Sequence, residues 1–350
     1  MGPALAEVHT GARPGDALAA VLAIDGGNSK TDVALVADDG TVLASARGPG
    51  INAHEVGVDQ TVLILDAVVK QAAARLDGFR PGFIAKHTVA CLANADLPEE
   101  EAEHAAAVRA QGWSPTATVV NDTFAILRAG SEPGEHWGVA VVCGAGINCV
   151  GVAPDGRVTR YLALGVISGD WGGGYGLGME VLWHAMRAED GRGPATALAG
   201  YLTSHLGVNR VEDVTLGIHK GKICEDDLTG LAPMLLRAAD EGDQVALAVV
   251  NRLADEVSVM AVTAMRRLGL ESLATPVVLG GSVLTARNPL LMDGIARRLA
   301  EAAPAAIMRV IDVAPVAGAA LLGLDHVHAS PAAQARLRAL YQTGVPSLRR

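Results

Sequence analysis

The feature that most constrains the fold of this sequence is a strand, a glycine turn and a second strand, which occur in this order twice. In the first copy the apolar run Val21–Ile24 leads into Asp25-Gly26-Gly27, and Val33–Val36 resumes the apolar pattern. The second copy runs from Val139 to Gly156 and carries Cys143-Gly144-Ala145-Gly146 at its turn. Each copy closes at an Asp-Gly pair. Repetition on this scale predicts two related lobes, each offering a glycine turn to a polyphosphate.

The first turn carries residue types suited to binding phosphate. Gly26 and Gly27 lack Cβ atoms, so they can take positive φ and let backbone N–H groups point into one concavity. Asp25, at the strand end, could hold Mg²⁺ through water. The side chains that follow can add hydrogen-bond donors: Asn28, Ser29, Lys30 and Thr31. The alternative is a tight hairpin with a glycine turn, because short glycine motifs are weak signals.

Length and composition fit a two-domain globular protein. The chain has 350 residues, of which 50% are hydrophobic, and a formal charge of −10. The acidic balance argues against a nucleic-acid partner, since a surface that follows phosphates needs a basic stripe. No run of 18 uninterrupted apolar residues occurs, so we expect no membrane span and a cytoplasmic protein. The four cysteines show no Cys-x-x-Cys spacing, and no zinc or iron–sulfur site is predicted.

Breaks in the pattern divide the chain into segments. Residues 1–19 lack the basic and apolar regions of a signal peptide and are predicted to be a flexible leader. The run 130–135 is rich in glycine, proline and acidic residues and is the clearest linker. We therefore place an N-terminal lobe at 20–130, a C-terminal lobe at 131–314, and a terminal helix with a tail at 315–350.

Polar residues outside the glycine turns are further candidates for chemistry. Asp122 follows the predicted strand Ala117–Val120, at the strand end where α/β folds place catalytic groups, and is a candidate general base. The alternative role for Asp122 is a helix N-cap. Asp170 lies in a glycine-dense segment and could contact a polar ligand, or it could meet the dipole at a helix start. Asn52 could hydrogen-bond a ligand, or it could be a turn residue.

A further glycine pair follows a strand near the end of the second lobe. Pro276–Leu279 is apolar and leads into Gly280-Gly281-Ser282. Two residues without side chains would let a flat base or a ribose lie against the backbone.

Taken in order, these motifs resemble the sugar kinase/Hsp70/actin superfamily, and within it the N-acetylglucosamine kinase branch of the BadF/BadG-type ATPases. The resemblance covers roughly residues 20 to 325. It rests on the ordered set of Asp25 to Thr31, Asn121-Asp122, Cys143 to Cys149, Gly169-Asp170 and Leu279 to Ser282. It implies an α/β, two-lobed actin-like ATPase built from duplicated ribonuclease H-like domains. It also implies a terminal helix that returns to the first lobe, and a homodimer.

The resemblance implies a role for each matching residue. Asp25 to Thr31 would form the first phosphate loop, with the Ser29 hydroxyl on ATP, and Gly144, Ala145 and Gly146 would form the second. Gly280, Gly281 and Ser282 would belong to the adenosine pocket, and Asp122 would be the catalytic base. Four residues would contact the sugar: Asn52, Asn121, Asn148 and Asp170. The family's hexosamine kinases transfer the γ-phosphoryl of MgATP to the sugar 6-hydroxyl, which implies ATP and Mg²⁺ as cofactors and a sugar substrate.

The sequence departs from the family at three positions. Ala145 and Ile147 stand where related kinases commonly carry Thr and Ser, which removes two hydroxyls. Trp171 follows Asp170 where many relatives have Glu. Two other readings stay open: an activator ATPase that couples hydrolysis to electron transfer from an iron–sulfur cluster, and a sensor that binds sugar or nucleotide without turnover.

Overall fold

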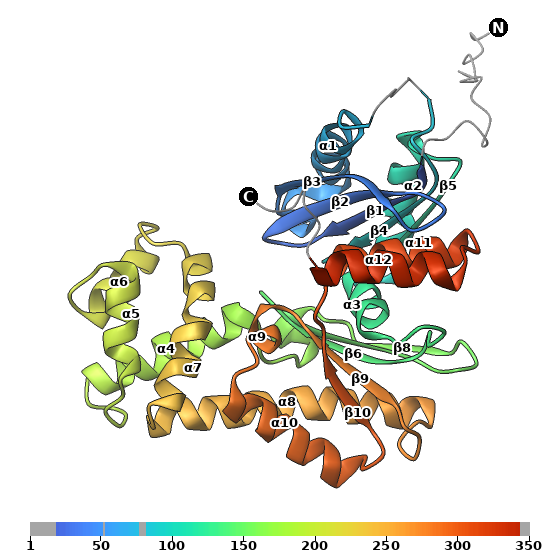
Figure 1. The fold of residues 1–350 in the computed structure, drawn as a ribbon. Helices are drawn as coiled ribbons and strands as arrows, with labels where there is room; N and C mark the ends of the chain where they lie inside the picture. Colours follow the sequence, from blue (N-terminus) through green and yellow to red (C-terminus); the bar gives the residue numbers. More distant parts are fainter. Residues whose placement is uncertain (1–18, 52, 77–81, 344–350) are drawn as a thin grey trace, which may run out of the picture. The chain divides into compact units, whose positions relative to one another are not determined.

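The computed structural model describes residues 19–51, 53–76 and 82–343 (Figure 1). The chain divides into two compact units. Unit 1 comprises the described residues up to Ala129 together with those from Val313 onward, and unit 2 comprises Gly130–Asp312. Unit 2 is therefore a continuous stretch of chain, whereas unit 1 is assembled from two separate stretches.

Unit 1 is built on a five-stranded sheet with the order β3-β2-β1-β4-β5. Its strands are β1 (Ala19–Gly26), β2 (Lys30–Val36), β3 (Val42–Pro49), β4 (Ala85–Leu92) and β5 (Thr116–Asn121). The first three form an antiparallel meander, and β4 and β5 run parallel to β1. The central strand β1 is buried along its whole length, which explains its nearly continuous apolar sequence.

Helices cover both faces of this sheet. Helices α1 (Ala53–Ala73) and α2 (Pro98–Ala110) pack on the face that carries Leu22 and Ile24 of β1. Helix α11 (Pro315–His326) packs on β1, β4 and β2 from the other face, where a Cβ at Gly323 would lie 2.2 Å from Val21 Cγ1. Helices α3 (Asp122–Gly130) and α12 (Pro331–Thr343) complete the unit. The segment expected to form one terminal helix thus forms two.

Unit 2 repeats the topology of unit 1. Its sheet has the order β10-β9-β6-β7-β8, which is a meander of β6, β7 and β8 followed by two strands parallel to β6. The strands are β6 (Gly138–Cys143), β7 (Ile147–Val152), β8 (Val158–Arg160), β9 (Pro276–Gly280) and β10 (Ile307–Val310). The two sheets therefore share one connectivity, and the α/β two-lobed fold that the repeated glycine turns indicate is confirmed.

A long helical insertion separates β8 from β9 in unit 2. It contains α4 (Gly173–Glu189), α5 (Leu198–Leu206), α6 (Val211–His219), α7 (Ala232–Asp240) and α8 (Gln244–Leu268), with two 3₁₀ turns at Gly165–Ser168 and Glu225–Leu231. After β9 follow α9 (Ser282–Thr285) and α10 (Pro289–Ala302). Leucine, valine and alanine fill the core between these helices and the sheet. Among the described residues, no helix combines the length and apolarity that a bilayer crossing requires.

Candidate functional site

The first glycine turn joins β1 to β2 and is held from both sides. The turn closes through Gly27 N–H, which donates to Lys30 O at 2.9 Å. Ile51 N–H donates to Gly27 O at 3.0 Å, and Ala93 N–H donates to Gly26 O at 2.8 Å. Among the described residues, no backbone carbonyl accepts from Asn28 or Ser29, and both residues are exposed. The turn therefore offers two unused N–H groups on a fixed backbone.

Gly26 is required by close packing and not by a positive φ. Neither Gly26 nor Gly27 has the positive φ that we predicted. A Cβ at Gly26 would instead lie 2.7 Å from Leu92 Cδ2. A Cβ at Gly50, in the neighbouring loop, would lie 1.9 Å from Asn28 O. Side chains at these positions would push the turn away from the strands that hold it.

The predicted side-chain donors of the turn differ in what they can reach. Ser29 and Asn28 are exposed, and Asn28 Oδ1 accepts from Asn94 Nδ2 at 2.6 Å. Lys30 is half-exposed, with Nζ 3.3 Å from Asp32 Oδ2. Thr31 is fully buried and its hydroxyl donates to Pro49 O at 2.8 Å. The hydroxyl proton of Thr31 is therefore used within the protein, and its donation to phosphate stays a prediction.

Asp25 lies at the end of β1 among other acidic side chains. Asp25 pairs directly with Asp32 across β1 and β2, and Arg47 binds Asp32 through two hydrogen bonds of 2.6 and 2.9 Å. Burial, together with the charges of Asp122 and Asp32, raises the pKa of Asp25 to about 8 against smaller effects of Lys30 and Arg47. A buried carboxylate whose charge lacks compensation suits a divalent cation with oxygen ligands, so this donor set fits Mg²⁺.

Asp122 is the first residue of α3, directly after β5. The capping role that was its alternative belongs to Asn121, whose Oδ1 accepts from the backbone N–H of Thr123 at 3.0 Å and from its hydroxyl at 2.6 Å. Burial raises the pKa of Asp122 to about 6, against a smaller lowering by Thr123 N–H. A carboxylate with this pKa can accept a proton at neutral pH and return it readily.

The side chain of Asn121, a predicted sugar contact, makes hydrogen bonds within the protein. Its side chain is only 3% exposed, and its Nδ2 donates to Asp96 Oδ1 at 2.8 Å while its Oδ1 caps α3. Its backbone N–H donates to Glu101 Oε1 of α2 at 2.8 Å. Asn121 therefore fixes the junction between β5 and α3, and with it the position of the next residue, Asp122. Asn52, the other sugar contact predicted in unit 1, lies outside the described residues.

The second glycine turn lies in unit 2 between β6 and β7. Gly144 N–H donates to Gly146 O at 2.9 Å, while Gly144 O and Ala145 O accept from Gly174 and Tyr175 N–H at 2.7 and 3.0 Å. The start of α4 therefore supports this turn. Among the described residues, no backbone carbonyl accepts from Ala145 or Gly146 N–H, and both residues are exposed. This turn, like the first, offers unused N–H groups.

The third glycine pair lies against the second turn. Gly281 has φ +83°, and a Cβ there would lie 2.4 Å from the carbonyl carbon and oxygen of Cys143 and 2.7 Å from Gly144 N. Gly280 ends β9, and Ser282 is exposed at the start of α9. The structure thus brings together two stretches, 143–146 and 280–282, that the sequence separates by the helical insertion. The phosphates and the adenosine of one nucleotide would need two binding stretches that are adjacent in this way.

The sugar contacts predicted in unit 2 are partly exposed. Asp170 accepts from the Ser168 hydroxyl, and it does not cap α4, whose N-cap is Gly172. Asn148 Oδ1 accepts from Cys149 N–H at 2.6 Å. Arg252 covers one face of the Trp171 ring at 3.9 Å from the ring centroid, and the indole N–H donates to Glu180 Oε1 at 3.0 Å.

Several residues with structural importance for the site escaped the sequence analysis. Asp32 and Arg47 form the ion pair beside Asp25, and Asp96 and Asn94 hold Asn121 and Asn28. The charged residues within the apolar β2 and β3 sequences are a signal for the first pair. No sequence signal joins Asp96 to Asn121, because they lie on different elements.

The described cysteines and acidic groups do not form a metal cluster. Cys91, Cys143 and Cys149 are buried, and Cys224 is exposed. In the part of the chain that the structure describes, no three His, Cys, Asp or Glu side chains converge on one metal position. Direct ligation by several protein groups is thus not seen there, whereas a cation held by Asp25 through water needs no such cluster.

The chain is similar to a family of ATPases and to sugar kinases. The model of the BadF/BadG/BcrA/BcrD ATPase family matches residues 22–323. The N-acetyl-D-glucosamine kinase of Dictyostelium discoideum is 26% identical over 313 residues, which cover 87% of this chain and 97% of that protein. The N-acetylmuramic acid/N-acetylglucosamine kinase of Clostridium acetobutylicum is 26% identical over 273 residues, which cover 77% of this chain and 87% of that protein.

A solved structure shares the fold. It belongs to a protein from Chromobacterium violaceum that is provisionally assigned as an N-acetylglucosamine kinase. The match has a TM-score of 0.68 and 22% identity, and it covers 87% of this chain and 98% of that one. At this identity the likeness establishes the two-lobed architecture.

Proposed function

Because this chain belongs to the BadF/BadG/BcrA/BcrD ATPase family, we propose that it is an ATP-dependent sugar kinase. Its substrate is an amino sugar, N-acetylglucosamine or glucosamine, and the product carries phosphate on the 6-hydroxyl. The observation that carries the proposal is Asp122: a buried carboxylate at a strand end, freed from capping by Asn121, with a pKa raised to about 6. Two relatives that act on such sugars, each 26% identical, support the substrate class.

In the proposed reaction, Asp122 accepts the proton of the sugar hydroxyl as that oxygen bonds to the γ-phosphorus, and ADP leaves as the bond from the γ-phosphorus to the bridging oxygen breaks. The unused N–H groups of Asn28 and Ser29, and those of Ala145 and Gly146, bind phosphate oxygens. Ser29 adds a hydroxyl, and Lys30 adds a charge. Asp25 would hold Mg²⁺ through water, and the ion would neutralise charge on the phosphates. Gly280, Gly281 and Ser282 receive the adenosine, while Asn148 and Asp170 hold the sugar.

The activator ATPase is the weaker candidate. An iron–sulfur cluster shared between subunits requires paired thiols at a surface. Cys91, Cys143 and Cys149 are at most 1% exposed, and burial raises the pKa of Cys143 to about 12 and that of Cys149 further. Such thiols do not readily ionise to ligate iron. A lone exposed Cys224 does not supply a pair.

The proposal is tested by measuring ADP release from MgATP with a panel of hexoses and hexosamines and with a control that lacks sugar. Release that depends on one amino sugar is the expected result, and mass spectrometry or NMR of the product then locates the phosphate. Release that is independent of sugar would instead support the activator ATPases. If no sugar causes ADP release, the result would support a sensor that binds its ligand without turnover.

A further inference from the structure

We propose that four side chains from three helices of unit 1 form a clamp that positions Asp122 for catalysis: Arg128, Asp325, Gln334 and Arg338. This inference rests on the proposed function, in which Asp122 is the base. The clamp, as we call these four residues, acts on the opposite end of α3 from Asp122. Its members are positioning residues, since they act through the helix and not on substrate.

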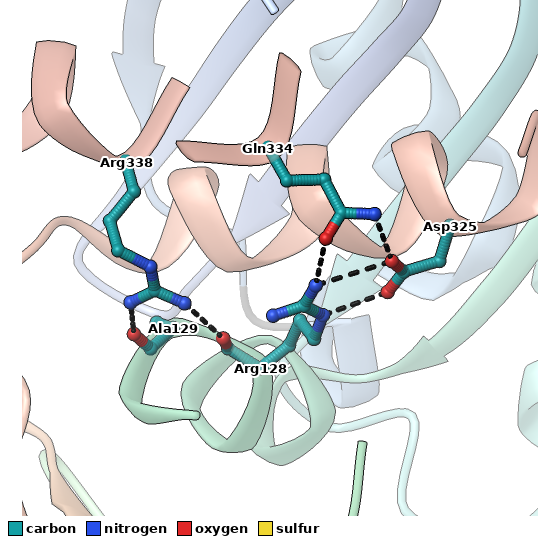
Figure 2. A network of polar contacts seen from close by, with 5 residues as sticks. All are labelled: Arg128, Ala129, Asp325, Gln334 and Arg338. Carbon is teal, nitrogen blue, oxygen red and sulfur yellow. Dashed lines mark hydrogen bonds and ion pairs between the residues drawn. The ribbon is translucent and has the colours of Figure 1, made fainter. Parts of the chain in front are cut away.

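The centre of the clamp is Arg128, near the C-terminal end of α3. Its guanidinium is buried, with the residue 3% exposed, and it bonds Asp325 of α11 through Nε at 2.7 Å and Nη2 at 3.2 Å (Figure 2). Nη2 also donates to Gln334 Oε1 of α12 at 2.9 Å. Gln334 Nε2 completes the triangle by donating to Asp325 Oδ1 at 2.9 Å. Two C-terminal helices thus meet on one α3 side chain.

Arg338 provides the second arm of the clamp, one turn after Gln334 on α12. Its Nη1 donates to Ala129 O at 2.6 Å and its Nη2 to Arg128 O at 3.3 Å (Figure 2). These carbonyls belong to the last turn of α3, where helical partners are missing and the helix dipole favours a cation. Arg338 therefore fixes the backbone of the helix end, whereas Arg128 fixes its side.

The backbones of α11 and α3 are in close contact, which restricts the movement of α3. A Cβ at Gly318 of α11 would lie 1.9 Å from Ala125 O, so the backbones of α11 and α3 touch. Helix α3 has nine residues, most of them buried. A helix this short, about 13 Å long, moves as one body. A shift at its last turn is therefore passed to its first residue, Asp122, where a displacement of about 1 Å can reduce turnover by about 10².

The decisive measurement is the separation of kcat from KM in clamp variants. Arg338→Met keeps the aliphatic stem and removes the two bonds to carbonyl oxygens. We expect kcat to fall about tenfold or more, while KM for sugar and for ATP changes less than about threefold, because the two bonds that are lost go to carbonyl oxygens at the end of α3 opposite Asp122. Arg338→Lys can still reach one carbonyl and should recover most of the lost kcat.

The matched control is Arg336→Met on the same helix. Arg336 forms an ion pair with Asp39, in the turn between β2 and β3. This variant loses an ion pair from α12 without touching the clamp, so kcat should stay within about twofold of wild type. Equal losses of kcat in Arg336→Met and Arg338→Met would mean that α12 only stabilises unit 1, and they would overturn the proposal.

Two further measurements keep the test decisive. If Arg338→Met does not fold by circular dichroism, Gln334→Met removes the hydrogen bonds without unpairing a charge, and unchanged kcat in that folded variant would refute the clamp. Amide hydrogen exchange gives a readout that needs no activity: exchange in the first turns of α3 should quicken in the clamp variant and not in the control. If the wild type phosphorylates no sugar, the proposed function fails, whereas unchanged exchange in α3 contradicts the clamp alone.

Discussion

At the scale of single residues, Asp122 is the side chain whose removal should separate chemistry from binding. Asp122→Asn keeps the shape of the side chain and cannot accept the hydroxyl proton, and Asp122→Ala removes the acceptor. We expect both to lower kcat by about 10² or more, with nucleotide affinity nearly unchanged. Steady-state kinetics and calorimetric titration with nucleotide measure the two effects. Glu99→Gln, an exposed acidic residue of α2, is the control, and wild-type turnover in Asp122→Asn would reduce Asp122 to a structural role.

The raised pKa of Asp122 also predicts a pH dependence of the reaction. The base must be ionised to accept a proton, and its pKa is about 6. Below that pH the protonated fraction grows, so kcat/KM should fall about tenfold per unit of decreasing pH, and it should level off above pH 7. The measurement is kcat/KM from pH 5 to 8 at saturating Mg²⁺. A profile that stays flat down to pH 5 would show that Asp122 titrates in its ordinary range or takes no proton.

A second buried group links protonation to stability instead of activity. His87 of β4 is 1% exposed, stacks on His326 of α11 at 3.6 Å between ring centroids, and places Nδ1 2.8 Å from Thr116 Oγ1. Burial, with a smaller contribution from the His326 charge, lowers the pKa of His87 to about 4. Between pH 6.5 and 4 the unfolded chain therefore binds a proton that the folded protein does not, and acid weakens folding.

We expect this linkage to lower the free energy of unfolding by up to about 2 kcal/mol between pH 7 and pH 5. Above pH 6.5 both states hold a neutral imidazole, so the contribution no longer depends on pH. His87→Phe keeps a ring against His326 and should lose this part of the acid sensitivity. Urea unfolding at the two pH values measures the effect, and equal acid sensitivity in wild type and His87→Phe would exclude His87 as its source.

Two of the predicted ligand contacts make hydrogen bonds within the protein, for one physical reason. Thr31 and Asn121 have the polar side chains of ligand-binding residues, yet each is buried and bonds to protein groups from another element. Residue type and spacing could indicate that a polar group stands at a strand end. Residue type and spacing could not show which group bonds to it, because tertiary packing places Pro49 beside Thr31 and Asp96 beside Asn121. The pKa of Asp122 likewise depends on burial that only the folded unit creates.

At the scale of elements, the contact between the two glycine stretches of unit 2 makes Gly281 sensitive to substitution. Ala at this position would combine a left-handed φ of +83° with a collision against the Cys143 carbonyl. We expect Gly281→Ala to separate residues 280–282, the proposed adenosine site, from residues 143–146, the proposed phosphate turn, and to weaken ATP binding at least tenfold. Fluorescence titration with a labelled ATP analogue provides the measurement.

Gly269→Ala serves as its control. Gly269 has a similar φ of +71° at the end of α8, but a Cβ there meets nothing within 4 Å. The substitution should cost about 1 kcal/mol of stability through backbone strain and leave ATP affinity unchanged. An equal loss of affinity in both variants would mean that strain in unit 2, and not the loop contact, controls binding.

Periodicity and glycine spacing predicted the elements better than the details of their turns. The strand–turn–strand repeat was visible because buried strands need apolar runs and each run ended at glycine. The structure confirms this repeat, because the two sheets have the same connectivity. The reason for glycine at Gly26 could not be read from the sequence, since a close approach to Leu92 and an unusual φ both select the same residue.

At the scale of the whole molecule, the continuity of unit 2 predicts that it can fold by itself. Residues 130–312 contain a complete sheet and a core of their own. Residues 1–129 alone lack α11, which covers the β1 face that carries Val21, and they should not fold. Circular dichroism with thermal unfolding of the two fragments tests this expectation. Cooperative unfolding of the 1–129 fragment would show that the C-terminal helices are dispensable for the sheet.

The interrupted unit 1 has a consequence for how this protein is made. A ribosome completes all five strands of the first sheet and then synthesises the whole of unit 2 before α11 emerges to cover the other face. At about 5 to 20 residues per second, that face waits roughly 10 to 40 seconds for its helix. During this interval the nascent chain exposes an apolar sheet surface, to which a chaperone could bind. Synthesis speed across residues 130–312 would then govern the yield of folded protein.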